Sequence, residues 1–186
     1  MIHDREILDR LSAITPITFN GEVHRATRKF LHPLTFSTSG GRWSLKGGVA
    51  TLYTSLEPDG ALAEITYHWS NLTPLPSKPA ALHRIRVKAR QTLRLLQVDL
   101  GSLGVSADLY AAINYQRTQE IGAAVAFLEC DGLLAPSARW SCENLILFND
   151  TLHAEDALAV IATEEIDWLS WARSHGLLDS DEATNA

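Results

Sequence analysis

The stretch from Gly40 to Glu64 (GGRWSLKGGVATLYTSLEPDGALAE) contains side chains whose types suit ligand binding better than core packing. Two glycine pairs flank Arg42, and Tyr53 and Glu64 follow shortly after them. Glycine permits positive φ and close approach of the backbone to a ligand, so Arg42 is expected on a loop between two flexible points. An arginine, a tyrosine and a glutamate in this arrangement are suited to binding a dinucleotide.

Two further side chains are candidates for the same site. Arg25 lies within a predicted strand, where an arginine is unusual unless it lines a cleft or pairs with a carboxylate. Ser137 lies on a predicted loop between two apolar segments. Each candidate also has an ordinary structural interpretation. A tyrosine on a strand is usually part of the core, a glutamate on a helix is usually solvated, and an arginine often forms a surface salt bridge.

Other well-known catalytic motifs are absent from the sequence. It has no Gly-x-Ser-x-Gly elbow, no His-Glu-x-x-His, no Walker loop, and no Gly-x-Gly-x-x-Gly after a strand. The seven histidines show no ligand spacing, so we expect no metal site. Cys130 and Cys142 do not form a Cys-x-x-Cys pair, and we expect buried, reduced thiols, as in a reducing cytoplasm.

The elements that must position the candidate residues can be predicted from local patterns. Residues 50–55 are apolar and rich in β-forming side chains, which predicts a strand. The acidic residues and the proline of 57–59 predict that a helix begins there. Apolar residues recur at helical spacing over 61–69, and Glu64 lies beside this stripe, from which it could point toward the strand and the glycine loop.

The rest of the chain is predicted to combine strands and helices around an apolar core. An N-terminal helix ends near Ser12, and Asn20-Gly21 turns the chain before a strand over 23–26. Loops are expected over 31–39 and over the proline-rich segment 71–79. Further strands are predicted over 81–88, 93–98, 133–135, 144–148 and 157–162, and further helices over 109–113, 118–128 and 167–175.

The composition is that of an acidic protein with enough apolar residues for a core. With 186 residues and 46% hydrophobic content, we expect one domain over 1–178, comprising an N-terminal helix and extension over 1–20 and a motif-bearing core over 23–148. The polar tail over 179–186 is expected to be disordered. A net charge of −6 argues against nucleic-acid binding. The N-terminus lacks a signal peptide, and the longest weakly charged run, 121–128, is too short to span a bilayer, so we expect a cytoplasmic protein without membrane contact.

Several motifs occur in a fixed order along the chain. They are Val23-His24-Arg25, Gly41-Arg42-Trp43-Ser44, Tyr53-Thr54-Ser55, Ala63-Glu64, and the segment 132–139 followed by 144–148. In this order they resemble the motifs of the RES-domain toxins, a family that takes its name from its arginine, glutamate and serine. The resemblance covers roughly residues 23–148, and the coincidence of several ordered motifs is far more specific than one short pattern.

The resemblance implies an α+β fold similar to the ADP-ribosyltransferases, with a mixed, mostly antiparallel β-sheet core and flanking helices. It also implies a toxin of a bacterial type II toxin–antitoxin system that degrades NAD by cleaving the nicotinamide–ribose bond. NAD would be the substrate, with no prosthetic group. The implied partner is a cognate helix-turn-helix antitoxin of the Xre type, and a homodimer or a higher complex with the antitoxin is a possible assembly.

Carried onto this sequence, the resemblance assigns catalytic roles to Glu64, Tyr53 and Arg25 and substrate-binding roles to Arg25, Arg42, Tyr53 and Ser137. Cleavage develops positive charge on the ribose, which the Glu64 carboxylate can stabilise. The forked guanidinium groups of Arg25 and Arg42 match a pyrophosphate. Tyr53 can stack against the nicotinamide ring. Ser137 can orient the nucleotide through a hydrogen bond.

The acceptor of the ADP-ribosyl group is left open by the sequence. Water would give hydrolysis, and inorganic phosphate as a co-substrate would give phosphorolysis. A protein side chain as acceptor would make the chain an ADP-ribosyltransferase. A third interpretation, from a different class, is a catalytically silent nucleotide-binding module. The complete set of arginine, tyrosine, glutamate and serine argues against it.

Overall fold

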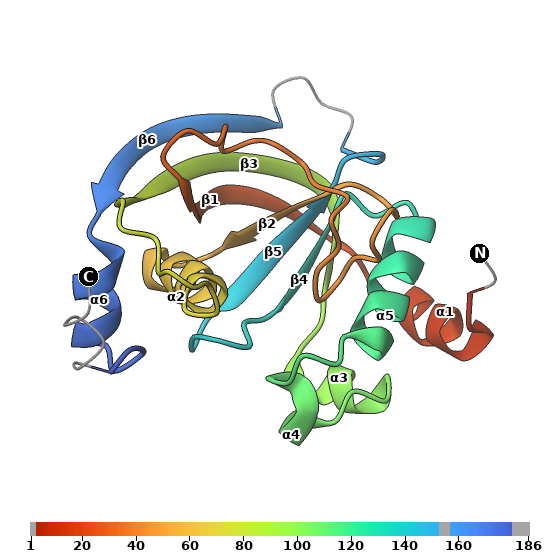
Figure 1. The fold of residues 1–186 in the computed structure, drawn as a ribbon. Coiled ribbons are helices and arrows are strands. Elements are labelled where there is room, and N and C mark those ends of the chain that lie inside the picture. The colour runs from red at the N-terminus through yellow and green to blue at the C-terminus, as the bar shows by residue number, and fades with distance from the viewer. Residues whose placement is uncertain (1–2, 153–156, 180–186) are drawn as a thin grey trace.

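The computed structural model describes residues 3–152 and 157–179, which form a mixed β-sheet with helices packed against it (Figure 1). In chain order the elements are α1 (Arg5–Ser12), β1 (Ile17–Arg28), β2 (Thr51–Ser55), α2 (Pro58–Trp69), β3 (Ala80–Arg94), α3 (Gln97–Ser102), α4 (Ala107–Tyr110), α5 (Gln116–Phe127), β4 (Gly132–Pro136), β5 (Glu143–Phe148), β6 (Leu158–Ile166) and α6 (Trp168–Ser174).

The sheet closes on itself into a ring. Its strand order is β1-β2-β5-β4-β3-β6, and β1 also pairs with β3, so all strands except β6 lie in a closed circuit. Among the described strands, every pairing is antiparallel except that of β3 with β4. The expected α+β class with a mostly antiparallel sheet is therefore confirmed.

Two apolar layers form on the two sides of the ring. Alternate residues of the strands point inward, because side chains along a strand alternate between the faces of a sheet. The inner cluster contains Val23, Leu52, Ile85, Val87, Ala89, Leu134, Leu145 and Leu147. On the outer face of β4 and β5, Leu133, Ile146 and Phe148 pack with residues of α1 and α5.

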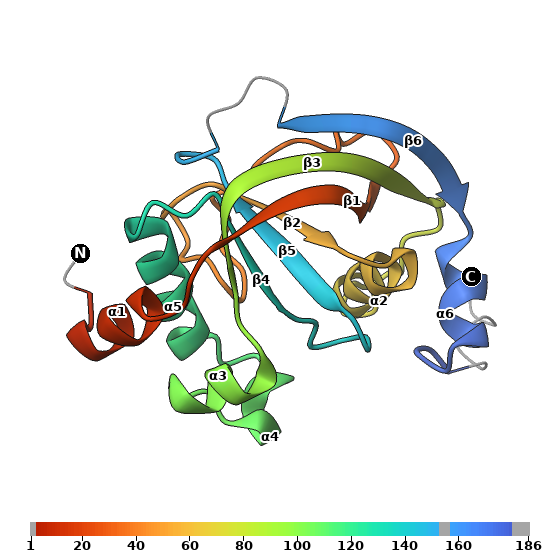
Figure 2. The ribbon, with the colours of Figure 1, turned by 180° about the vertical axis from the view of Figure 1, so that it is seen from behind.

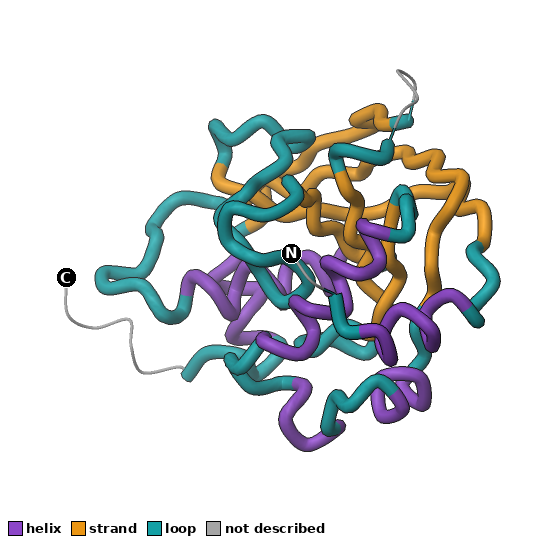
Figure 3. The backbone as a smooth tube through the Cα atoms, turned by 90° about the vertical axis from the view of Figure 1, so that its right-hand side faces the viewer, coloured by secondary structure: helices purple, strands orange, loops and turns teal. Residues whose placement is uncertain are grey.

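Four of the described helices lie in two pairs beside the strands. Figure 1 shows α5 next to α1 at one end of the molecule and α2 next to α6 at the other, and Figure 2 shows the same arrangement from behind. The view of Figure 3 shows that most helical turns lie to one side of the strands. No helix in the described ranges is both long and apolar enough to cross a membrane.

Two sequence predictions in the sheet are wrong, and both errors have the same cause. Asn20-Gly21 does not turn the chain, because β1 continues through it and pairs Asn20 with Lys88 and Gly21 with Val87. Likewise, no turn separates two strands over 81–98. The strand β3 runs without interruption to Arg94, and residues 97–102 form the helix α3. In both places, pairing with a distant strand overrides a weak local turn preference.

Most other predicted elements are confirmed with small shifts in their ends. The N-terminal helix, the strands that became β2, β4 and β5, and the helices that became α2, α5 and α6 are all present. The helix expected over 109–113 is α4, which begins at Ala107, and the strand expected over 157–162 is β6, which extends to Ile166. Both cysteines are free, with Cys130 buried and Cys142 half-buried. Of the expected disordered tail, residues 180–186 lie outside the described residues.

Candidate active site

A cavity of about 460 Å³ opens between β1, β2, α2 and the glycine-rich loop, which comprises residues 40–48. This size is typical of small-molecule sites. Its wall includes Arg25, Arg42, Tyr53 and Glu64, so the structure brings four of the five candidate residues to one cavity. The fifth, Ser137, is not among the lining residues, but its hydroxyl donates a hydrogen bond to the Glu64 carboxylate. The assignment of roles to these residues stays a prediction.

Glu64 reaches the cavity from α2, which lies against β2 at its first turn. Pro58 occupies that turn, where its missing N–H has no intrahelical partner to lose. Gly60 allows the close contact, because a Cβ there would lie 2.2 Å from the Ser55 hydroxyl oxygen and 2.5 Å from the Cys142 sulfur. Glu64 follows one helical turn later and projects into the cavity wall.

One oxygen of the Glu64 carboxylate receives two hydrogen bonds. The Ser137 hydroxyl donates to Oε1 at 3.1 Å, and the Asn144 side-chain amide donates to the same Oε1 at 2.9 Å. Within the described ranges, no hydrogen bond reaches the second oxygen, Oε2. The carboxylate is therefore fixed through Oε1, and Oε2 is left for a ligand.

Ser137 begins a tight connection between β4 and β5, in agreement with the loop expected there. Its backbone N–H donates to the Cys142 carbonyl at 2.8 Å. Its hydroxyl oxygen accepts from the backbone N–H groups of Arg139 and Trp140, at 3.2 and 3.3 Å. Because the single hydroxyl proton goes to Glu64, Ser137 links the conformation of this loop to the orientation of the carboxylate.

Arg25 projects from β1 without a carboxylate partner in the described part of the chain. Its Nη1 donates to the Thr35 carbonyl at 3.2 Å. Burial of the guanidinium lowers the pKa of Arg25 to about 10, because the charged form has lost water and gained no counter-charge. A partly buried cation of this kind is suited to binding an anionic group of a ligand.

Arg42 lies on the glycine-rich loop and is enclosed by aromatic rings. Its guanidinium carbon is 4.8 Å from the ring centre of Tyr110 and 4.6 Å from that of Tyr115, and its Nη1 donates to the Tyr110 carbonyl. Cation–π contact on two sides restricts the side chain while leaving donors of the fork available. The sequence pattern gave no signal for either tyrosine.

Tyr53 supports this loop through its hydroxyl group. The Tyr53 hydroxyl oxygen accepts from the Trp43 backbone N–H at 2.9 Å and exchanges a 3.0 Å hydrogen bond with the Ser44 hydroxyl. It lies directly under Gly41, where a Cβ would come within 2.7 Å of it. Burial raises the pKa of Tyr53, because a low-polarity environment favours the neutral phenol.

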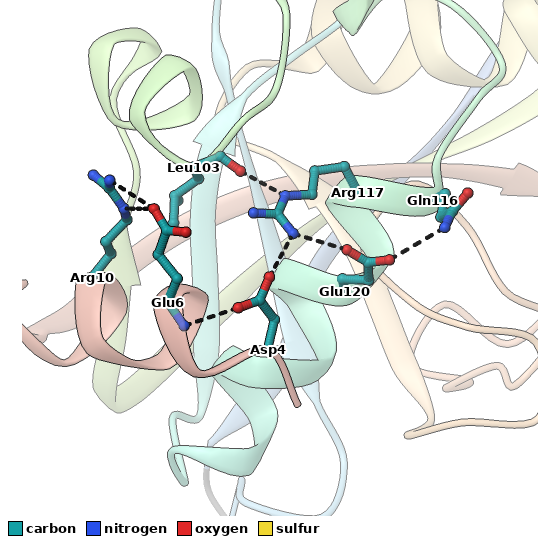
Figure 4. Close-up of polar contacts among 7 residues, drawn as sticks. All are labelled: Asp4, Glu6, Arg10, Leu103, Gln116, Arg117 and Glu120. Carbon is teal, nitrogen blue, oxygen red and sulfur yellow. Dashed lines mark hydrogen bonds and ion pairs between the residues drawn. The ribbon is translucent and has the colours of Figure 1, made fainter. Parts of the chain in front are cut away.

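The segment that supplies the two tyrosines is anchored by Arg117 on α5 (Figure 4). Its Nε donates to the Leu103 carbonyl at 2.7 Å, and its Nη1 donates to Asp4 and Glu120 at 3.2 and 3.1 Å. Asp4 is also the N-cap of α1 and accepts from the Glu6 backbone N–H. One arginine therefore joins the N-terminal helix, α5 and the chain that leads to Tyr110.

Sequence reasoning missed two polar residues that line the cavity. Asn144 appeared only as part of an apolar strand, although an asparagine at the head of the run Asn-Leu-Ile-Leu-Phe was an available signal. Arg139 also lines the cavity, and its guanidinium carbon lies 3.4 Å from the ring centre of Tyr67.

The cavity is positively charged although the chain carries a net charge of −6. Three arginines line it, Arg25, Arg42 and Arg139, against the single carboxylate of Glu64. No ion pair involves any of these three arginines in the ranges that the structure describes. Over the same ranges, no group of three or more histidine, cysteine or acidic residues could hold a metal ion. The cavity therefore favours an anionic ligand.

The fold is similar to a solved structure, and the sequence matches a known family. The fold is similar to that in the crystal structure of the M. tuberculosis MbcT-MbcA toxin-antitoxin complex, with a TM-score of 0.79 and 18% sequence identity over 91% of this chain and 97% of that chain. No curated protein matches the sequence. The family model described as RES domain matches residues 22–170. Since that match covers most of the sequence, the chain belongs to the RES domain family.

Proposed function

We propose that this protein is a toxin of a bacterial type II toxin–antitoxin system that cleaves the nicotinamide–ribose bond of NAD. The observation that carries the proposal is the carboxylate of Glu64, which is fixed through one oxygen inside a cavity lined by three arginines. Among residues 3–152 and 157–179, none of these arginines has a carboxylate partner. The substrate of such a cavity carries negative charge, and its reaction develops positive charge near the carboxylate. A dinucleotide with a pyrophosphate and a glycosidic bond to nicotinamide has both properties.

The proposed chemistry begins with departure of neutral nicotinamide. As the glycosidic bond breaks, its electron pair leaves with the nicotinamide nitrogen, and the ribose carbon becomes cationic. The free oxygen of Glu64 stabilises this cation, while Arg25 and Arg42 hold the pyrophosphate. Attack by water then gives ADP-ribose and a proton, and attack by phosphate gives the corresponding ribosyl phosphate.

The test is release of nicotinamide from NAD by the purified protein, measured by chromatography. Parallel reactions with and without inorganic phosphate identify the acceptor, because the two products differ by one phosphoryl group in mass. A reaction with added cell protein and labelled NAD detects transfer to a side chain. If none of these reactions releases nicotinamide, the proposed activity is wrong.

We propose further that the partner of the toxin is a helix-turn-helix antitoxin of the Xre type and that it covers the cavity in the cytoplasm. The similar fold of the M. tuberculosis toxin-antitoxin complex supports the existence of a partner. Beside the cavity, Phe30 is 83% exposed and Leu31 is 45% exposed, which leaves apolar surface for contact. The three cavity arginines would attract a carboxylate of the partner.

A competition experiment tests this mode of inhibition. Expression of the toxin alone is expected to arrest growth, and co-expression with the helix-turn-helix protein encoded beside it is expected to restore growth. Saturating NAD is expected to weaken the complex in a pull-down. A complex that forms equally well with saturating NAD and remains active would place the inhibitor on a distant surface.

A further inference from the structure

The connection between β4 and β5 holds the Glu64 carboxylate from one side. Ser137 stands at the start of this connection and Asn144 follows its end, and both donate to Oε1 of Glu64. The carboxylate belongs to α2, which is far away in the sequence. Two donors on one oxygen restrict rotation of the carboxylate more strongly than one donor, so this hairpin, and not α2 alone, determines where Oε2 lies.

Asn144 is held rigidly enough for this task. It is paired with Ser55 of β2 on one side and with Ala135 of β4 on the other, so its Cα lies between two strands inside the sheet. The direction of its amide follows from charge. If the carbonyl oxygen instead of the Nδ2 faced Glu64, two acceptors would oppose each other, so the Nδ2 donates.

The carbonyl oxygen of the same amide indicates that the contact between Asn144 and Glu64 does not serve mainly to stabilise the fold. Asn144 Oδ1 is buried and has no hydrogen-bond partner in the described chain. A buried acceptor without a partner destabilises the folded state, so an apolar side chain of similar size would suit the strand better. The asparagine therefore calls for an explanation beyond packing, and its donor to Glu64 supplies one.

We propose that Asn144 is a positioning residue of the reaction: together with Ser137 it holds Glu64 so that Oε2 is presented to the cationic ribose. This inference rests on the proposed cleavage of NAD. A carboxylate that is already oriented need not reorganise as charge develops, which is the basis of electrostatic preorganisation. Loss of one donor should therefore lower kcat and leave KM for NAD nearly unchanged, because Asn144 acts on the transition state through Glu64.

The first test replaces the donor by a second carboxylate. In Asn144→Asp, two carboxylates face each other at hydrogen-bond distance and share a proton near neutral pH. The acid limb of the kcat profile is expected to move upward by about one pH unit or more. The matched control is Asn149→Asp, the same change just beyond the other end of β5, where the residue is exposed. The control is expected to keep the wild-type profile.

The second test asks whether the two donors act through the same oxygen. Asn144→Leu and Ser137→Ala are each expected to lower kcat by roughly 10- to 100-fold, the range for a hydrogen bond to a charged group. The double variant should lose less than the product of the two single losses, because a carboxylate freed by one change has less orientation left to lose. Thermal unfolding of each variant shows whether the fold is retained.

The outcomes separate this inference from the proposed function. Wild-type protein that releases no nicotinamide overturns the proposed function, and the inference falls with it. Wild-type protein that cleaves NAD, while folded Asn144→Asp keeps the wild-type pH profile and folded Asn144→Leu keeps wild-type kcat, overturns the inference alone. An upward shift of the acid limb in Asn144→Asp that is absent from Asn149→Asp supports it.

Discussion

The hydroxyl of Tyr53 accepts a 2.9 Å hydrogen bond from the backbone N–H of Trp43, and this contact ties the strand β2 to the loop that carries Arg42. The loop is held from other sides as well. The Gln119 amide on α5 donates to the Gly41 carbonyl at 2.9 Å. Gly122, also on α5, permits the approach of the Trp43 carbonyl, since a Cβ there would lie 1.9 Å from that oxygen. Tyr53 therefore lines the cavity with its own ring and also supports the loop that carries Arg42.

Tyr53→Phe tests this supporting role. The change keeps the aromatic ring but removes the acceptor of the Trp43 N–H, so the loop that carries Arg42 is held less firmly. Binding of NAD is therefore expected to weaken by about 1 kcal/mol, which is ~5-fold in affinity. Isothermal titration calorimetry measures the change. If Tyr53 acted only by stacking on the substrate, the phenylalanine variant would bind NAD with wild-type affinity.

Glu64→Gln tests the central carboxylate. The amide has nearly the same shape and loses only the negative charge that meets the developing cation, so kcat is expected to fall by about 100- to 1000-fold. Unfolding temperature should change little. Glu164→Gln on β6 is the control, because Glu164 is exposed and does not line the cavity. Near-normal turnover of Glu64→Gln would remove Glu64 from the mechanism.

Replacement of the cavity arginines is expected to weaken NAD binding. Arg25→Ala and Arg42→Ala each remove a charge-assisted contact, which predicts a loss of affinity of roughly 10- to 100-fold. Lysine at either position should restore only part of it, because an ammonium group cannot make two parallel hydrogen bonds. Arg28→Ala is the control, since Arg28 is exposed at the end of the same strand as Arg25. Calorimetry with NAD measures all five variants, and unchanged affinity in both alanine variants of the cavity would make these arginines structural.

The contact between Asp4 and Arg117 predicts a pH dependence of stability. The hydrogen bond from Arg117 is the largest cause that lowers the pKa of Asp4 in the folded protein. The unfolded state therefore takes up the proton first as pH falls, so the contribution of Asp4 is present above its ordinary pKa of about 3.9 and is lost as pH falls through its lower folded pKa. Between about pH 7 and about pH 3, the free energy of unfolding, measured by urea denaturation, should fall more in the wild type than in Asp4→Asn. Equal losses would show that the contact does not contribute.

The sequence alone predicted the local elements around the site. It also assigned the candidate residues to a single site. Proline in the first helical turn predicted the start of α2, and the apolar runs predicted β2, β4 and β5. The ordered motifs predicted the family, which the match over residues 22–170 shows. These features could be predicted because each depends on neighbours within a few residues along the chain.

Only the tertiary structure decided what the candidate side chains contact. Asn20-Gly21 is extended because of its pairing with Lys88 and Val87, and no local pattern records that partner. The same holds for Glu64, whose donors Ser137 and Asn144 are separated from it by 73 and 80 positions in the chain. Pairing of β2 with β5 places Ser55, just before α2, opposite Asn144 and so brings these segments together. A hydrogen bond depends on distance and angle in space, so the orientation of the carboxylate follows from that pairing and not from the residues beside Glu64 in the sequence.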